Sequence, residues 1–381
     1  MFKINSKQIN NFIKTHKIPL IIGGIAALLI IGGTIAYLAL TPKETPKQDP
    51  EVVTPEPEKP IIFYSELTGR PVATEEEILA PTTCIMIENS PDARPQSGLR
   101  DAGTVYEAIA EGGITRFLTV FQDRKPELIG PVRSLRMYYL DWLTPYDCSI
   151  AHVGGSDEAL KAVRNPANGY HDIDQFFNAD FYWRSKDRAA PHNVYTSFEK
   201  LDALNAKKGH TVSNFTSFTR RAEAKTFDPT YHCPEDETCS SVMPSPISNI
   251  NIKISSNLYN PHYKYNQETN TYDRYHQYNT TPHMVKYSDG TTAQISPDVV
   301  IAMMVNETSS TTEPGREAIE TLGSGKAYVF QAGDVTVGTW KRPTKSEVPK
   351  FYDENNKEII LNPGQVWLSA VPNHSGTVTY E

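Results

Sequence analysis

The sequence contains little cysteine and lacks the short motifs of several common enzyme classes. Only four cysteines occur in 381 residues. No G-x-S-x-G segment is present, which excludes the nucleophile elbow of α/β-hydrolases. H-E-x-x-H, dinucleotide-binding and P-loop patterns are also missing, so the sequence predicts neither a metal nor a cofactor.

The sequence also lacks an excess of positive charge. The formal net charge is −8, of which the first forty residues contribute +4, leaving −12 on the rest. An acidic surface argues against nucleic acid and anionic lipid as main partners. The acidity is also explained by solubility alone, which is the commoner reason for such a charge.

No charge interrupts the run from Pro19 to Leu40, which is long enough for a helix to span a bilayer. Four lysines precede it without an acidic residue, so the positive-inside rule places residues 1–18 in the cytoplasm and the rest of the chain outside. A cleaved signal peptide is the alternative, although 37–39 is a poor cleavage site. The lack of a cysteine near the end of the run excludes lipid attachment to a cysteine there.

Beyond this predicted transmembrane helix at 19–40, composition divides the chain into four parts. The stretch 41–60 holds six prolines and reads as an extended tether. Strand and helix patterns then alternate over 61–225, which predicts an α/β domain with a mixed sheet. The polar stretch 226–247 reads as a linker or insertion, and 248–381 is predicted to be a smaller, mostly β domain with hairpins near 263–275 and 326–340.

Three serine or threonine positions are predicted to begin helices. Ser134 and Ser156 precede helical patterns, and Thr196 with Glu199 forms a capping box. The segments 82–88, 104–110, 115–122 and 148–153 are predicted to be strands.

The cysteines predict a structural disulfide rather than a zinc site. Cys233 and Cys239 flank a short polar loop that an oxidising compartment would allow to close. His232 is adjacent, but a fourth zinc ligand is missing. Cys84 and Cys148 lie in apolar runs and are expected to be buried fillers, bridged only if their strands are neighbours.

Charged and turn-forming residues cluster where predicted strands end. Glu111 ends one run, Arg133–Arg136 follows the next, and His152 precedes Gly-Gly-Ser at the end of a third. Such ends commonly build a site at one edge of a sheet.

The arginines at this edge have two interpretations. Arg133 and Arg136 at a helix start would suit a phosphate or carboxylate, as an anion clamp. Alternatively each arginine pairs with a carboxylate such as Glu107, Glu111 or Asp141. The sequence weighs these equally.

His152, His192, Asn193 and Glu111 together have the chemistry of an acid–base set. A lone histidine at a strand end is more often structural. The many aromatic residues between 138 and 183 could line a sugar groove, although most such clusters are core.

Several segments resemble YerB-like exported proteins in the same order along the chain. They are ARPQSGL at 93–99, VYEAIAEGGITRF at 105–117, GPVRSLR at 130–136, HVGGSDEA at 152–159, APHNVYTS at 190–197, GTW at 338–340 and NPGQVWLSAVP at 362–372. The resemblance implies a two-domain envelope protein, often a lipoprotein in Gram-positive bacteria, with no established activity. This sequence differs in having the apolar N-terminal run without a lipid-bearing cysteine, and in the Cys233–Cys239 loop.

Together these features predict a membrane-anchored extracytoplasmic protein that binds an anionic or sugar-containing cell-wall ligand or an envelope partner protein. The alternative is a transferase or hydrolase of cell-envelope polymers, and a purely structural scaffold is a third. The candidate ligand-binding residues are Glu111, Arg116, Arg133, Ser134, Arg136, His152, His192 and Asn193.

Overall fold

A computed structural model describes residues 28–34, 36–37, 39–40, 62–228, 245–277 and 280–381. The chain separates into two units, Met1–Pro60 and Ile61–Glu381. In the first unit, the described residues between 28 and 40 are helical. Within the described ranges, no helix has the length and apolar character needed to cross a membrane. Half of the expected helix at 19–40 and the whole tether at 41–60 fall outside these ranges.

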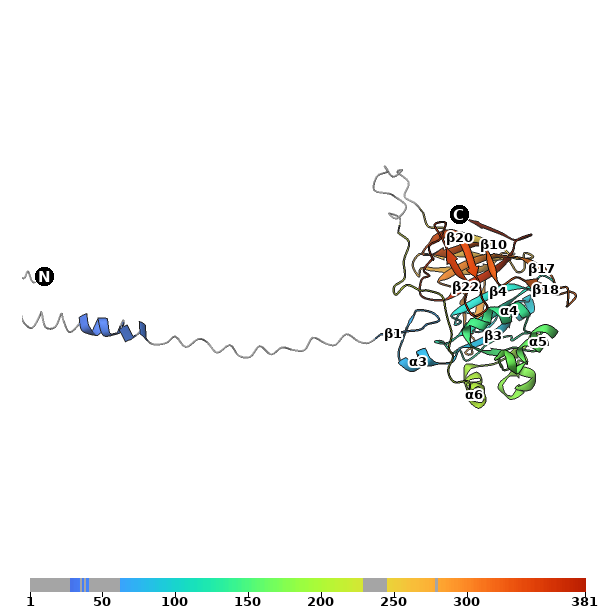
Figure 1. The fold of residues 1–381 in the computed structure, drawn as a ribbon, viewed down its shortest axis with the longest axis horizontal. Coiled ribbons are helices and arrows are strands. Elements are labelled where there is room, and N and C mark those ends of the chain that lie inside the picture. The colour runs from blue at the N-terminus through green and yellow to red at the C-terminus, as the bar shows by residue number, and fades with distance from the viewer. Residues whose placement is uncertain (1–27, 35, 38, 41–61, 229–244, 278–279) are drawn as a thin grey trace, which may run out of the picture. The chain divides into compact units, whose positions relative to one another are not determined.

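A ten-stranded mixed sheet organises the second unit (Figure 1). Strand β22 lies at its centre and pairs in parallel with both β16 and β4. Both halves of the chain therefore contribute to one sheet. Its order is β21 (Lys350–Tyr352), β20 (Asp334–Arg342), β19 (Gly323–Gln331), β16 (Val299–Val305), β22 (Val366–Pro372), β4 (Thr104–Glu111), β5 (Ile114–Phe121), β3 (Thr83–Glu88), β6 (Ser149–Ala151) and β7 (His171–Asp172).

The sheet is buried on both faces, because successive side chains of a strand point to opposite sides. Tyr106 and Leu368 belong to one apolar core, whereas their neighbours Val105 and Trp367 belong to another. This double burial explains why β22 has no exposed position.

Different layers cover the two faces. Helices α4 (Met137–Leu143) and α5 (Asp157–Val163) contribute to the core of Tyr106. Helix α6 (Phe198–Lys208) and a five-stranded antiparallel sheet contribute to the other core. The order of that sheet is β13 (Thr281–Pro282), β12 (Thr271–His276), β11 (Pro261–Asn266), β10 (Asn249–Lys253) and β23 (Thr377–Tyr380).

The remaining described elements are short. They are helix α3 (Glu75–Leu79) and the strand pairs β1 (Phe63–Tyr64) with β2 (Pro71–Val72), β8 (Trp183–Arg184) with β9 (Val194–Tyr195), β14 (Met284–Lys286) with β15 (Thr292–Gln294), and β17 (Glu307–Ser309) with β18 (Glu317–Ile319). The expected α/β alternation thus holds in outline only, as a mixed sheet with few helices. The mostly β character expected of the C-terminal part is confirmed, including the hairpins β11–β12 and β19–β20.

Two of the three predicted helix starts are displaced. Ser156 does cap α5, since its hydroxyl accepts a hydrogen bond from the backbone of Ala159. Ser134 does not cap α4, which begins only after Arg136. The reason is that residues 133–135 are extended, with the Leu135 N–H donating to the Gly154 carbonyl.

The start of α6 differs from the prediction by one residue. The cap is Ser197, whose hydroxyl accepts from the backbone of Lys200. Thr196 instead pairs its backbone with Ile129 and donates its hydroxyl to the Phe181 carbonyl, so it cannot cap.

Cys84 and Cys148 form a disulfide with a Cα–Cα distance of 5.7 Å, a pairing that the sequence left open. The bridge is possible because β3 and β6 are parallel neighbours, with Cys84 opposite Ile150. Both cysteines are buried. Cys233 and Cys239 lie outside the described residues.

Candidate functional site

The structure brings together the three strand ends that the sequence singles out. The Val153 N–H donates to the Arg133 carbonyl at 3.1 Å. Arg116 donates to the Ser134 carbonyl at 2.8 Å, and Arg136 reaches Glu111. The Arg133 N–H also donates to the Met86 carbonyl of β3 at 2.8 Å, so this segment contacts both β3 and the loop after β6.

At this edge, two of the predicted arginines already hold a carboxylate. Arg136 donates to both oxygens of Glu111 at 2.6 and 2.7 Å, and Arg116 lies 3.2 Å from it. Burial raises the pKa of Glu111, but the charges of Arg116 and Arg136 outweigh it and bring the pKa to about 2. Both arginines are buried, so an external anion would have to displace Glu111.

A second carboxylate, Glu88, anchors the other predicted residues. Its Oε1 accepts from Ser90 Oγ and contacts His192 Nδ1, each at 2.8 Å. Its Oε2 lies 3.3 Å from Arg133 Nε. Glu88 is buried, whereas the His192 side chain is 22% exposed and its Nε2 lies 3.9 Å from Asp92. His192 is thus an oriented imidazole with one accessible side.

His152 and Asn193 have structural environments. The His152 ring is fully buried, with Nδ1 at 2.8 Å from the Gly154 carbonyl and Nε2 at 3.1 Å from Asp172. Asn193 donates to the Ser185 carbonyl and accepts from Arg184, which fixes the β8–β9 hairpin.

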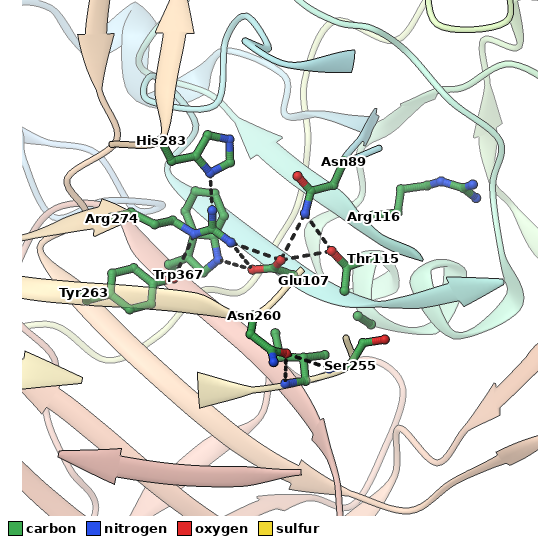
Figure 2. Close-up of polar contacts among 12 residues, drawn as sticks. Asn89, Glu107, Thr115, Arg116, Ser255, Asn260, Tyr263, Arg274, His283 and Trp367 are labelled. Carbon is green, nitrogen blue, oxygen red and sulfur yellow. Dashed lines mark hydrogen bonds and ion pairs between the residues drawn. The ribbon is translucent and has the colours of Figure 1, made fainter. Parts of the chain in front are cut away.

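Sequence reasoning missed a buried polar cluster between the ten-stranded and five-stranded sheets (Figure 2). Arg274 donates to both oxygens of Glu107, at 3.1 and 3.0 Å, and Trp367 Nε1 donates to the same carboxylate at 3.0 Å. The Glu107 carboxylate also accepts from Thr115 at 3.1 Å. The one available signal was a carboxylate at the middle of the apolar strand pattern VYEAIA.

Aromatic rings enclose the arginine of this cluster. The Arg274 guanidinium lies 4.8 Å from the Trp367 ring centroid, and its Nε donates to the Tyr263 hydroxyl at 3.3 Å. His283 contacts its Nη1. Burial lowers the Arg274 pKa, but Glu107 outweighs this effect and raises it. Because every charge is paired and out of reach of solvent, the cluster locks the two sheets together rather than forming an open site.

Three hollows adjoin one another beside this buried cluster. We call them the apolar hollow (about 530 Å³), the central hollow (about 690 Å³) and the outer hollow (about 560 Å³). The first two share Arg94 and Pro95, and the last two share Leu128, Tyr287 and Ser288. They therefore form one groove, lined by loops and short strands from both halves of the chain.

The central hollow combines aromatic rings with charges of both signs. Trp183 and Tyr195 stack at 6.4 Å between centroids with an interplanar angle of 25°. Lys286 lies across from Asp187 at 3.8 Å. Arg188 donates to three backbone carbonyls, of Asp92, Arg94 and Pro95, and so fixes the loop that forms one wall.

Most of the predicted site residues do not line this groove. Six of them, namely Glu111, Arg116, Arg133, Ser134, Arg136 and His152, are absent from its lining. His192 approaches it through Asp92, and Asn193 shapes the adjoining hairpin. In the part of the chain that the structure describes, no group of three or more His, Cys, Asp or Glu side chains could hold a metal ion.

Comparison with known proteins identifies the family. Residues 67–211 match the N-terminal domain, and residues 250–368 the C-terminal domain, of a family described as protein of unknown function DUF3048. The chain belongs to this family. It is 30% identical over 312 residues to YerB of Bacillus subtilis (strain 168), named as a candidate lipoprotein, covering 80% of this chain and 85% of that protein.

The fold is also that of a solved relative. The crystal structure of YerB from Bacillus subtilis matches with a TM-score of 0.64 and 24% identity, covering 83% of this chain and 99% of that one. The resemblance to YerB-like proteins expected from the sequence motifs is therefore confirmed, with a two-domain architecture.

Proposed function

We propose that this protein is an extracytoplasmic component of the cell envelope that binds a sugar-containing, anionic cell-wall ligand in the groove. The run at 19–40 holds it at the membrane, with residues 1–18 on the cytoplasmic side. The observation that carries the proposal is the central hollow, where the stacked Trp183–Tyr195 pair adjoins Lys286, Asp187 and Asp92.

The chemistry of this hollow suits a sugar. Pyranose rings present C–H faces to aromatic side chains, while their hydroxyl groups bond to charged and polar groups at the rim. Lys286 and Asp187 are 44% and 77% exposed in their side chains, so both are accessible to such hydroxyl groups.

Two further observations support the location. The Cys84–Cys148 disulfide is typical of proteins in an oxidising compartment. YerB, the relative that aligns with most of this chain, is named as a candidate lipoprotein, which is an envelope protein class. A partner protein of the envelope is the competing occupant of the groove.

The test is binding of the full chain in detergent to solubilised cell-wall glycan, measured by calorimetry. Trp183→Ala is expected to weaken binding at least tenfold, because stacking on the ring is lost. The matched control is Phe176→Ala, which removes a 65% exposed aromatic side chain that does not line the groove. Equal binding by wild type and Trp183→Ala would contradict the proposal.

A second candidate function, an enzyme of cell-envelope polymer metabolism, is favoured by the Glu88–His192 pair. A carboxylate on Nδ1 leaves Nε2 as the proton-accepting nitrogen, as in acid–base catalysis. The test is release of soluble fragments from cell-wall polymer. Release by wild type and none by His192→Gln would establish the enzymatic function, provided that the variant has the melting temperature of wild type. Turnover by His192→Gln at the wild-type rate would exclude this histidine as the acid–base group.

A further inference from the structure

The apolar hollow has a different character from the central hollow that it adjoins. Its lining is mainly apolar, from Pro91, Pro95, Leu258, Pro282 and Met284. Leu258 is 41% exposed although it is a large apolar side chain. A hollow of about 530 Å³ lies within the usual range of small-molecule sites.

The polar residues of this hollow carry no charge at neutral pH, Arg94 excepted. The rings of His276 and His283 lie 4.2 Å apart between centroids and are tilted by 37°. Burial, together with the charges of Arg94 and Arg274, lowers the pKa of His276 to about 3 and that of His283 well below its ordinary value. Both imidazoles are therefore neutral, and the wall suits a hydrocarbon.

Arg94 stands at the boundary, since it lines both hollows. Its Nε donates to Asn89 Oδ1 at 3.1 Å, and its Nη2 to the carbonyls of Asn89 and Leu258 at 3.0 and 2.9 Å. Its Nη1 donates to no group within the described residues. Burial lowers the Arg94 pKa to about 10, which still leaves the guanidinium charged at neutral pH.

We infer that the groove takes an amphiphile in which a sugar is joined through a phosphate to a hydrocarbon chain. The sugar lies against Trp183, the phosphate accepts from Arg94 Nη1, and the chain fills the apolar hollow beside Leu258. A guanidinium held by three other bonds and offering one remaining nitrogen is preorganised for such an anion. The placement of the sugar rests on the proposed function, whereas the phosphate and chain rest on the apolar hollow.

A peptide with an apolar side chain is the competing occupant, and strand pairing argues against it. An extended peptide adds to a sheet through an open strand edge. Strand β14, which contributes Met284 and Lys286 to the groove, is paired with β15 on one side and bridges Gln96 on the other. Strand β14 therefore offers no open edge. The edge strand β13, which also lines the hollow, is two residues long, and its Pro282 has no N–H to donate to a peptide.

The test compares binding of octyl phosphate, inorganic phosphate and methyl maltoside to the full chain held in amphipol or nanodisc. Empty carrier serves as the blank, and octyl phosphate is kept below the concentration at which it forms micelles. Octyl phosphate is expected to bind at least tenfold more tightly than inorganic phosphate, because each methylene group that is buried can raise the binding constant by up to about fourfold. Leu258→Glu is expected to remove this gain. Leu322→Glu, at a leucine that is 38% exposed and outside the groove, is the matched control and is expected to retain it.

The outcomes separate the two proposals. Octyl phosphate binding no tighter than inorganic phosphate, or equally tight in Leu258→Glu, overturns the amphiphile inference. Methyl maltoside binding that Trp183→Ala does not weaken counts against the sugar site alone. An uncharged leucine-containing tripeptide is tested as a competitor. If it binds at least tenfold more tightly than octyl phosphate, the hollow is a peptide site and the inference fails. Met284→Glu repeats the test from the other wall if Leu258→Glu does not fold.

Discussion

Glu107 and Arg274 form a buried ion pair at 3.0 Å although they lie 167 residues apart in the chain. Glu107 belongs to β4 in the ten-stranded sheet and Arg274 to β12 in the five-stranded sheet. Both side chains have an exposed fraction of 1% or less. The pair therefore connects the two sheets. Arg274 also contacts His283, which lines the apolar hollow.

Removing one partner of this pair is expected to destabilise the protein strongly. Arg274→Met leaves the Glu107 carboxylate buried without its cation, which should lower the free energy of unfolding by about 3–5 kcal/mol. Urea denaturation monitored by tryptophan fluorescence measures this. Lys125→Ala, in the exposed pair with Asp202, should cost about 1 kcal/mol or less and is the control. The double variant Glu107→Leu/Arg274→Met should be more stable than Arg274→Met, and the reverse order would contradict the role assigned to the pair.

The Cys84–Cys148 disulfide is expected to be a major source of stability. It closes a loop of 64 residues, and the chain-entropy relation gives about 4 kcal/mol for a loop of that length. Unfolding of wild type should therefore shift to lower urea concentration on adding a reductant that reaches the buried bridge. Cys84→Ser/Cys148→Ser should show the lower stability with and without reductant. Identical midpoints for wild type and the double variant in the absence of reductant would contradict this expectation.

The edge cluster should make stability depend on acid pH. The pKa of Glu111 is lowered from 4.5 to about 2 by Arg116 and Arg136. Because the folded-state pKa is depressed, the ionised Glu111 side chain adds to the free energy of unfolding above about pH 5. This contribution is lost as the pH falls through about 2. After allowance for a side chain that is 35% exposed, we expect about 1–2 kcal/mol.

The measurement is the unfolding free energy of Glu111→Gln and wild type from pH 7 to pH 2. The difference between them should shrink as the pH falls. Glu354→Gln, at an exposed position in the turn after β21, supplies the comparison and should track wild type throughout. A constant difference across this range would show that the ionised form of Glu111 is not the stabilising one.

Gly338 in β20 is expected to accept no larger residue. A Cβ atom there would lie 1.9 Å from the carbonyl oxygen of Tyr352 in the neighbouring strand, so the backbone of β20 or β21 would have to move. Gly338→Ala should lower the melting temperature by several degrees, with about 1–3 kcal/mol lost to strain. Gly112 has open space around its Cβ position, and Gly112→Ala serves to show the separate effect of a positive φ of 59°. A wild-type melting temperature for Gly338→Ala would contradict the close approach.

The strands could be predicted from the sequence because their signal is local. The alternating or continuous apolar runs of β3, β4, β5 and β22 give the period and burial of each strand directly. Which strands pair is a long-range property, and no local pattern indicates that β22 lies between β16 and β4. The Cys84–Cys148 disulfide could not be decided from the sequence for the same reason, since it depends on the pairing of β3 with β6.

The candidate site was predicted less completely, for a related reason. The sequence placed Glu111, Arg136 and His152 at one edge, where the structure brings them together, but it could not distinguish an arginine that binds a ligand from one that binds Glu111. Trp183 comes from strand β8, and Arg94 and Leu258 come from two separate loops, without a shared motif. Only their approach in space makes a groove.

The central place of β22 also constrains how the chain is made. All residues up to 365 are synthesised before β22 exists, so β4 keeps one edge unpaired until residues 366–372 follow. An unpaired buried-type strand edge is prone to pairing with other chains. We therefore expect nascent or C-terminally truncated chains to require a chaperone. A stop codon before residue 366 should yield a product that aggregates rather than a smaller folded protein.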